Sequence, residues 1–197
     1  MSRLAWSPCA ALLLAALSLP AAAKGGPVCY GFDRQPEGAQ WAVGDTIPID
    51  DFGRVEVREL LVDGKPYGAD TRFLRRVGNG IAGGSAPAVY AKNVVLRLQP
   101  KAPVTRISMR VAQQPGAAGA RPATVEVNGE RHEFAGSLQQ LDGRVLGAPA
   151  AARLKVRLPV ADGAYDVGQL VVESQAGIRS FSIGAAELHL DDVCFER

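Results

Sequence analysis

The sequence predicts an all-β protein: an antiparallel β-sandwich that follows a cleavable signal peptide. Three observations lead to this prediction. Apolar and polar residues alternate over several short runs, Asp-Gly and Asn-Gly pairs fall between those runs, and no segment shows a sustained helical period with caps. Many short strands in one domain favour a sandwich or a barrel.

The first 23 residues have the features of a signal peptide. Arg3 supplies a positive charge, an apolar run covers residues 10–19, and Ala21 and Ala23 are the small residues that a signal peptidase requires. This run is too short to span a bilayer, and no later apolar run reaches the roughly 18 residues that a span needs. We therefore expect cleavage after Ala23, a secreted or periplasmic bacterial protein, and a single domain over residues 24–197.

Charge and motifs narrow the class of function. Removing residues 1–23 takes one arginine and no acid from 22 basic and 20 acidic residues, which leaves a net charge of about +1. A nearly neutral chain argues against a dedicated nucleic-acid-binding protein. The HExxH, GxSxG and phosphate-loop signatures are also missing. We therefore expect a protein that is not an enzyme.

Cysteine usage predicts a covalent link between the two ends of the mature chain. Cleavage removes Cys9 and leaves Cys29 and Cys194. An even number of cysteines in an exported protein favours a disulfide. We therefore expect a Cys29–Cys194 bond, against the alternative of two free thiols.

Alternation identifies strands in the middle of the chain, and glycine pairs identify turns. The runs RISMRV (106–111), RLKVRL (153–158) and VVLRL (94–98) alternate with period two, which is typical of half-buried strands. The apolar residues expected to face the core are Val94, Leu96, Leu98, Ile107, Met109, Val111, Leu154, Val156 and Leu158. Four pairs suit two-residue hairpin turns: Asp63-Gly64, Asn128-Gly129, Asp142-Gly143 and Asp162-Gly163. A turn at Asn128-Gly129 would place Glu126 opposite Arg131, a favourable pair of charges.

The two ends of the mature chain carry the only family resemblance. Near the start stands CYGFDRQPEGAQWAVGD, and near the finish stands LHLDDVCF. Together these segments resemble the galactose-binding-like jelly rolls, which include many secreted carbohydrate-binding modules. The resemblance implies that the terminal strands lie side by side. It also implies a structural calcium held by the acid after the N-terminal aromatic residue, here Asp33, and by an Asp of the closing strand.

The register of the closing strand leaves the calcium ligand open. If Cys29 faces Cys194, position 31 faces Asp192, and Asp33 lies one diagonal step away, roughly 7–8 Å. Alternation along each strand does not agree with this register, so one strand must carry a bulge or bend, or else Asp191 is the ligand. Calcium prefers carboxylate, carbonyl and water oxygens. The alternative is a solvated pair of acids at the rim of the sheet.

Glycan or cell-envelope material is the expected ligand. Flat rings can stack on sugars, and the candidates are Trp41, Tyr67 and Tyr90, each with the alternative of a core position. A second candidate surface is a stripe of outward-facing basic residues on two predicted strands, which would bind acidic polysaccharide if those strands were neighbours. The stripe comprises Arg106, Arg110, Arg153, Lys155 and Arg157. The second hypothesis is a structural domain that recognises another protein through its loops and binds no sugar.

Overall fold

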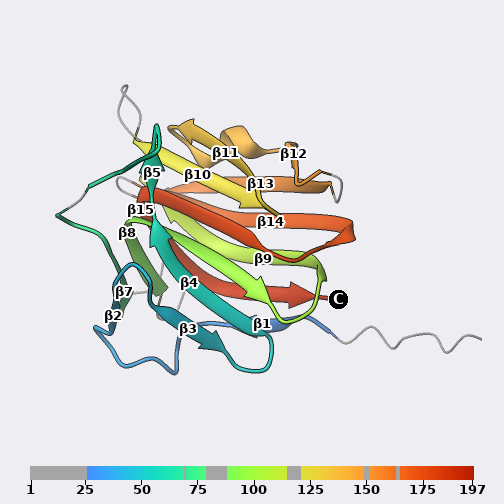
Figure 1. The fold of residues 1–197 in the computed structure, drawn as a ribbon, viewed down its shortest axis with the longest axis horizontal. Helices are drawn as coiled ribbons and strands as arrows, with labels where there is room; N and C mark the ends of the chain where they lie inside the picture. Colours follow the sequence, from blue (N-terminus) through green and yellow to red (C-terminus); the bar gives the residue numbers. More distant parts are fainter. Residues whose placement is uncertain (1–25, 69, 79–87, 115–120, 149–150, 163–164) are drawn as a thin grey trace, which may run out of the picture.

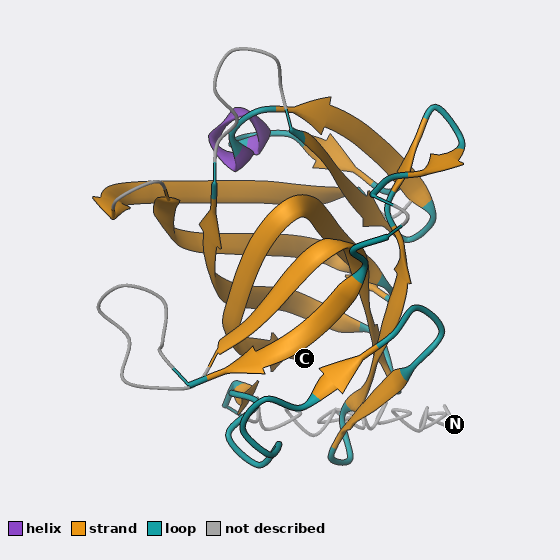
Figure 2. Ribbon diagram, turned by 90° about the vertical axis from the view of Figure 1, so that its left-hand side faces the viewer, coloured by secondary structure: helices purple, strands orange, loops and turns teal. Residues whose placement is uncertain are grey.

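The protein is a two-layered antiparallel β-sandwich in a computed structural model (Figure 1). The structure describes residues 26–68, 70–78, 88–114, 121–148, 151–162 and 165–197. The expected signal peptide (1–23) lies outside these residues. Almost all of the described chain is strand, loop or turn, and Figure 2 shows one short helix, the 3₁₀ helix η1 (Leu138–Leu141). The all-β sandwich predicted from the sequence is confirmed.

The first layer is a sheet of six strands, all antiparallel to their neighbours. Its order is β3, β4, β8, β15, β10 and β11. The strands are β3 (Thr46–Ile49), β4 (Gly53–Glu59), the second half of β8 (Ala88–Pro100), the first half of β15 (Phe181–Glu196), β10 (Pro122–Val127) and β11 (Glu130–Ala135). A separate small hairpin, β5 (Leu61–Val62) with β6 (Lys65–Pro66), follows β4.

The second layer contains the other halves of the two long strands. Its order is β12, β13, β14, β9, β15, β8, β7 and β2. The strands not yet given are β12 (Val145–Leu146), β13 (Ala152–Asp162), β14 (Tyr165–Ile178), β9 (Val104–Gln113), β7 (Phe73–Val77) and β2 (Gln40–Trp41). The short β1 (Val28–Tyr30) pairs with the end of β15, beyond the point where β8 stops pairing.

Strands β8 and β15 pass from one layer to the other through a shared irregularity. Asn93 has a left-handed φ of 53°, and it stands level with Ala186 on β15. In each strand, the residues that face the core change between even and odd numbers at this level. On β8, Val94 and Leu96 face the core on one side of it, and Val89 and Ala91 face the core on the other. A single left-handed residue lets a strand bend and re-aim its side chains, as in a β-bulge. Asn93 is held by hydrogen bonds from its Nδ2 to the carbonyl and hydroxyl oxygens of Thr71, each 3.0 Å.

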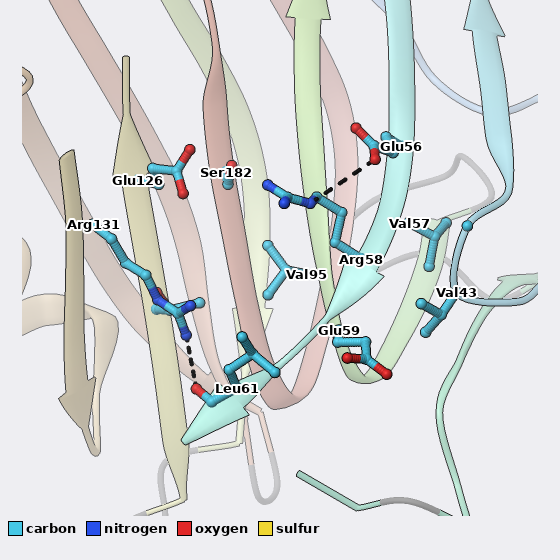
Figure 3. A pocket seen from close by; sticks show the side chains of 12 residues that line it. Val43, Glu56, Val57, Arg58, Glu59, Leu61, Val95, Glu126, Arg131 and Ser182 are labelled. Carbon is cyan, nitrogen blue, oxygen red and sulfur yellow. Dashed lines mark hydrogen bonds and ion pairs between the residues drawn. The ribbon is translucent and has the colours of Figure 1, made fainter. Parts of the chain in front are cut away.

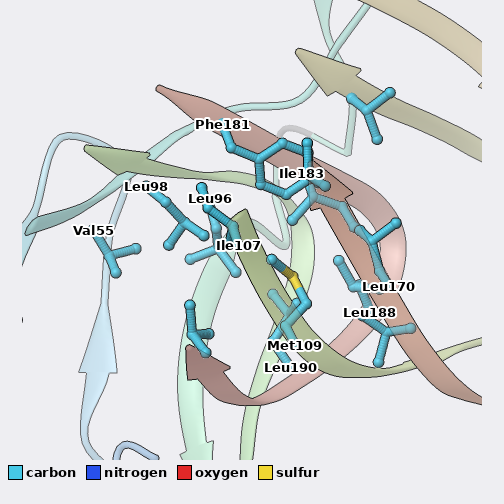
Figure 4. Close-up of a cluster of buried hydrophobic side chains, with 14 of the residues drawn as sticks. Val55, Leu96, Leu98, Ile107, Met109, Leu170, Phe181, Ile183, Leu188 and Leu190 are labelled. Carbon is cyan, nitrogen blue, oxygen red and sulfur yellow. The ribbon is translucent and has the colours of Figure 1, made fainter. Parts of the chain in front are cut away.

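The core lies between the layers and follows the predicted alternation. Leu96, Ile107 and Met109 are at most 1% exposed, and Figure 4 shows them packed with Phe181 and Ile183 of β15. The other predicted core residues are also buried, except Leu158, which is partly buried against the same cluster.

Two of the four predicted hairpin turns are confirmed. Asn128-Gly129 and Asp63-Gly64 connect paired strands with positive φ at both positions. Asp142 instead ends η1 as its C-cap, so Asp142-Gly143 is a turn after a helix. Asp162 pairs with Tyr165, and Gly163 lies outside the described residues, so the structure does not describe the expected turn at Asp162-Gly163.

Candidate functional site

The two ends of the mature chain are joined as the sequence predicted. Cys29 and Cys194 face each other in the antiparallel pair β1–β15 and form a disulfide. Figure 1 shows β1 beside the end of β15 that carries the C-terminus. The disulfide therefore fixes the segment that follows β1, including Asp33, against the acidic end of β15.

A β-bulge at Asp192 resolves the register conflict seen in the sequence. Asp191 pairs with Arg110 of β9, and Cys194 pairs with Ser108, so Asp192 and Val193 together stand opposite one residue. Asp192 has a left-handed φ of 49°, which a β-bulge permits. The sequence allowed three ways for an acid of the closing strand to face Asp33: a bulge, a bend, or Asp191 as the residue concerned. The structure contains the bulge.

This bulge brings Asp192 close to Asp33. A Cβ atom on Gly31 would lie 3.0 Å from Oδ2 of Asp33 and 3.8 Å from Oδ1 of Asp192. The two carboxylates thus lie around the same point in space, and only glycine leaves that point open. Two carboxylates so placed repel each other unless a cation or a proton lies between them.

Asp191 forms the buried side of this acidic cluster. Its side chain is fully buried; Oδ1 accepts a hydrogen bond from the backbone N–H of Asp192 at 2.8 Å, whereas Oδ2 has no partner among the described residues. Burial raises the pKa of Asp191 to about 6; the hydrogen bond from Asp192 opposes this shift, and the charges of Asp192 and Asp33 add to it. Asp33 and Asp192 thus both lie near enough to Asp191 for their charges to raise its pKa.

A calcium ion in this cluster would need to take most of its shell from backbone carbonyls and water. Within the described ranges, no group of three or more His, Cys, Asp or Glu side chains has the arrangement of a metal site. Calcium, however, takes six to eight oxygens, including backbone carbonyls and water, and needs few carboxylates. The unpartnered Oδ2 of Asp191 and the facing carboxylates of Asp33 and Asp192 are the observations that favour the ion.

The three aromatic candidates do not form one surface. Trp41 pairs with Leu74 of β7 and packs against the main core, so its ring is partly buried there. Tyr67 follows the β5–β6 hairpin, where its backbone N–H donates to the carbonyl of Leu60, and its side chain is exposed. Tyr90 lies on β8 with its ring on the outer face of the second layer, opposite His189. Only Tyr90 belongs to a larger group of rings.

That group is a row of four rings across four strands, called here the aromatic row: Phe73 (β7), Tyr90 (β8), His189 (β15) and Tyr165 (β14). The ring centroids are 5.9 Å apart from Phe73 to Tyr90, 4.8 Å from Tyr90 to His189, and 5.1 Å from His189 to Tyr165. Each of the four residues is partly exposed. No local pattern in the sequence connects His189 with Tyr90, because their contact depends on the pairing of β15 with β8.

Polar groups line one edge of the aromatic row. The carboxylate of Glu187 forms an ion pair with Nη1 of Arg121 at 2.8 Å, and its charge acts on the hydroxyl of Tyr90. Burial raises the pKa of Tyr90 to about 12, with Glu187 adding to the shift. Burial also lowers the pKa of His189, against the opposing charge of Glu187, so the row is uncharged at neutral pH.

The predicted basic stripe does not form, because β14 lies between β9 and β13. Glu173 of β14 pairs with Lys155 at 2.6 Å and with Arg106 at 3.7 Å, which neutralises part of the charge. The condition under which the sequence allowed a basic stripe, that β9 and β13 are neighbours, is not met. No helix in the described part of the chain is long and apolar enough to cross a bilayer.

Comparison with known proteins shows only distant likeness. No family model matches the sequence, and no curated protein matches it. The K1 cleaved adhesin domain of Lys-gingipain from Porphyromonas gingivalis W83 is 13% identical, with a TM-score of 0.40 over 81% of this chain and 98% of that one. The K2 cleaved adhesin domain of Lys-gingipain is 16% identical, with a TM-score of 0.38 over 86% and 97%. The catalytic domain of a GH87 α-1,3-glucanase is 10% identical, with a TM-score of 0.34 over 87% and 28%.

Proposed function

We propose that the chain is an exported, non-catalytic binding domain that recognises glycan or cell-envelope material through the aromatic row. The observation that carries the proposal is the unbroken contact of Phe73, Tyr90, His189 and Tyr165 across the outer face of the second layer. Partly exposed rings offer apolar faces to the C–H groups of a sugar. Glu187 and Arg121 beside them offer an acceptor and donors to its hydroxyls.

Export is part of this proposal. The expected signal peptide over residues 1–23 directs the chain out of the cytoplasm, and the Cys29–Cys194 disulfide suits an oxidising compartment. A disulfide and a calcium ion at the same strand ends would both hold the termini of the sandwich, as in the galactose-binding-like jelly rolls that the sequence resembles. Asp33, Asp191 and Asp192 would hold that ion.

Tyr165→Ala tests the glycan site, with Tyr67→Ala as the matched control. The mature protein is applied to a glycan array and to polysaccharide isolated from bacterial envelopes. We expect Tyr165→Ala to lose binding by about tenfold or more, since stacking and apolar contact of one ring contribute on that scale. Tyr67→Ala removes an exposed tyrosine outside the row and should bind as wild type does.

Two results would count against the proposal. Binding that is unchanged in Tyr165→Ala and in Phe73→Ala, with both variants folded by circular dichroism, excludes the row as the site. Failure of wild type to bind any glycan, together with retention of an envelope protein that Tyr165→Ala loses, would favour the alternative of a protein-interaction domain.

A further inference from the structure

The outer face of the first layer, opposite in the sandwich to the aromatic row, is hollowed along the first half of β15. Three cavities of about 360, 330 and 430 Å³ lie on this face or at its end, where the second is lined by the Asn128-Gly129 turn and by Ala176 and Gly177 at the end of β14. Arg179 lines both the second and the third cavity. Arg97 of the second pairs across the sheet with Ser182 of the first. We call the three together the β15 trough.

The trough exists because β15 presents small residues between two strands with larger ones. On the outer face, Gly184 of β15 stands between Val95 of β8 and Thr124 of β10, and Ser182 stands between Arg97 and Glu126. A Cβ atom on Gly184 would lie 2.6 Å from the carbonyl oxygen of Val94 and 2.7 Å from a methyl group of Val95, so no larger residue fits. The neighbouring strands thus close over Gly184, and of this part of β15 it is the small side chain of Ser182 that lines the first cavity.

Two polar groups in the floor of the trough have no hydrogen-bond partner among the residues that the structure describes. The hydroxyl of Ser182 and Nε of Arg97 are buried without a hydrogen bond to the described residues. Both belong to one cross-strand row, in which Ser182 stands between Arg97 and Glu126. Buried polar groups in native structures are nearly always satisfied, so these two atoms need a partner from outside the described chain, either a bound water or a ligand.

The carboxylate of Glu126 is also available. Arg131 faces it across the hairpin, as the sequence predicted, but donates instead to the hydroxyl of Thr124 at 3.2 Å and to the carbonyl of Leu61 at 2.7 Å. Glu126 makes no hydrogen bond or ion pair with any other residue that the structure describes. Figure 3 shows Glu126 beside Ser182, with Arg58 and Glu56 on the opposite side of the cavity.

Charge differs between the two ends of the trough. The first cavity is lined by three acidic residues and two arginines, whose groups both donate and accept. Among the described residues that line the second and third cavities there is no acid, and four cations gather there: Arg54, Arg97, Lys101 and Arg179. The ligand thus needs an anionic group at this end and uncharged polar groups at the other.

We propose that the β15 trough binds an acidic oligosaccharide, with a uronic carboxylate at the Arg97–Arg179 end and sugar hydroxyls at Ser182, Glu126 and Arg58. Guanidinium groups bind carboxylates through charge-assisted, often bidentate, hydrogen bonds. The trough extends over Arg54 to Arg58 of β4, about 14 Å at the rise of a strand, which suits a short oligosaccharide. The inference rests on the proposed glycan function and adds a second, charge-selective surface.

Other linear anions fit the trough less well. The floor strands β8, β15 and β10 are hydrogen-bonded to one another, so an extended peptide would find no free strand edge to pair with. No aromatic residue lines any of the three cavities in the described chain, so nucleic-acid bases would find no ring on which to stack. Sugar hydroxyls, in contrast, need only side-chain donors and acceptors.

The test compares oligogalacturonate with its methyl-esterified form, which lacks the charge. Calorimetric titration of the mature protein should show binding of the free acid at least about tenfold tighter than binding of the ester, since hydrogen bonds to charged groups contribute on that scale. Arg179→Gln should lose about the same factor, because its exposed side chain lines both basic cavities. Arg153→Gln, an exposed arginine on the second layer, is the matched control and should bind as wild type does.

A second variant blocks the floor without touching charge. Ser182→Val should abolish binding of both oligosaccharides by filling the trough, while valine suits a strand position. Equal affinity for acid and ester, or equal losses in Arg179→Gln and Arg153→Gln, overturns the inference. If Tyr165→Ala loses the acidic ligand and Arg179→Gln does not, the trough is excluded as its site, while the proposed glycan function stands. If wild type binds no glycan at all, the trough proposal and the glycan function both fail.

Discussion

The backbone N–H of Asp192 donates to Oδ1 of its neighbour Asp191 at 2.8 Å, and the second oxygen of Asp191 is buried without a partner. This contact depends on the left-handed bulge at Asp192. A regular strand would place the two adjacent carboxylates on opposite faces. The bulge breaks this alternation and brings Asp192 close to Asp33. An acidic cluster thereby forms where β15 meets the disulfide.

Calcium should stabilise the folded protein through this cluster. With the ion at about one hundred times its dissociation constant, ligand linkage adds about 2.7 kcal/mol. For a domain of this size we expect Tm to rise by roughly 5–10 °C relative to chelator. Differential scanning fluorimetry with calcium and with EGTA measures the shift.

Asp192→Asn and Asp33→Asn should each remove most of that shift. Asp63→Asn is the control, because Asp63 lies at a distant turn where asparagine adopts the same left-handed backbone. A Tm that calcium leaves unmoved in wild type excludes the ion.

Reduction of the disulfide should destabilise the protein strongly. Cys29 and Cys194 are 165 residues apart, and closing a loop of that length removes about 5 kcal/mol of unfolded-state entropy on the loop-closure relation. We expect Cys29→Ser/Cys194→Ser to lose about 2–5 kcal/mol in urea denaturation. A double variant as stable as wild type would show that the bond does not constrain the unfolded chain.

Gly184→Ala should destabilise the first layer. Its Cβ would meet the carbonyl of Val94 and the side chain of Val95 at distances that only backbone movement relieves. Overpacking of this kind costs about 1–3 kcal/mol. Gly26→Ala, where a Cβ meets nothing within 4 Å, is the control in the same urea denaturation. Equal stability of the two variants would mean that the strand adjusts without strain.

Stability should fall in mildly acidic solution partly because of His132. Its ring stacks on Phe134 at 5.9 Å, its Nε2 is buried without a partner among the described residues, and burial, with Arg144 nearby, lowers its pKa. The unfolded state therefore binds a proton more readily than the folded state. This contribution is fully present above pH 6.5, the ordinary pKa of histidine, and is lost as pH falls below it.

His132→Phe keeps an aromatic ring and removes the proton site. Between pH 7.5 and 5.5, the urea midpoint of the variant should fall less than that of wild type. Burial also lowers the pKa of His189, so some pH dependence should remain. If the urea midpoints of variant and wild type fall by the same amount over this pH range, His132 is excluded as the source of the pH dependence.

The amino-acid sequence by itself determined the fold class, the disulfide, the core-facing side of each main strand and the hairpin at Asn128-Gly129. Each of these depends on local signals: alternation places residues i and i+2 on one face, and a left-handed turn needs Asn or Gly. The disulfide followed from an even count of cysteines in an exported chain.

Only the tertiary structure decided which strands are neighbours. Strand β14 separates Lys155 from Arg106, and Tyr90 meets His189 across a pairing about a hundred residues apart. The bend at Asn93 and the trough over Ser182 likewise come from the pairing of β8 with β15. Lateral strand order is set by burial and hydrogen bonding summed over the whole sandwich, and no local pattern encodes it.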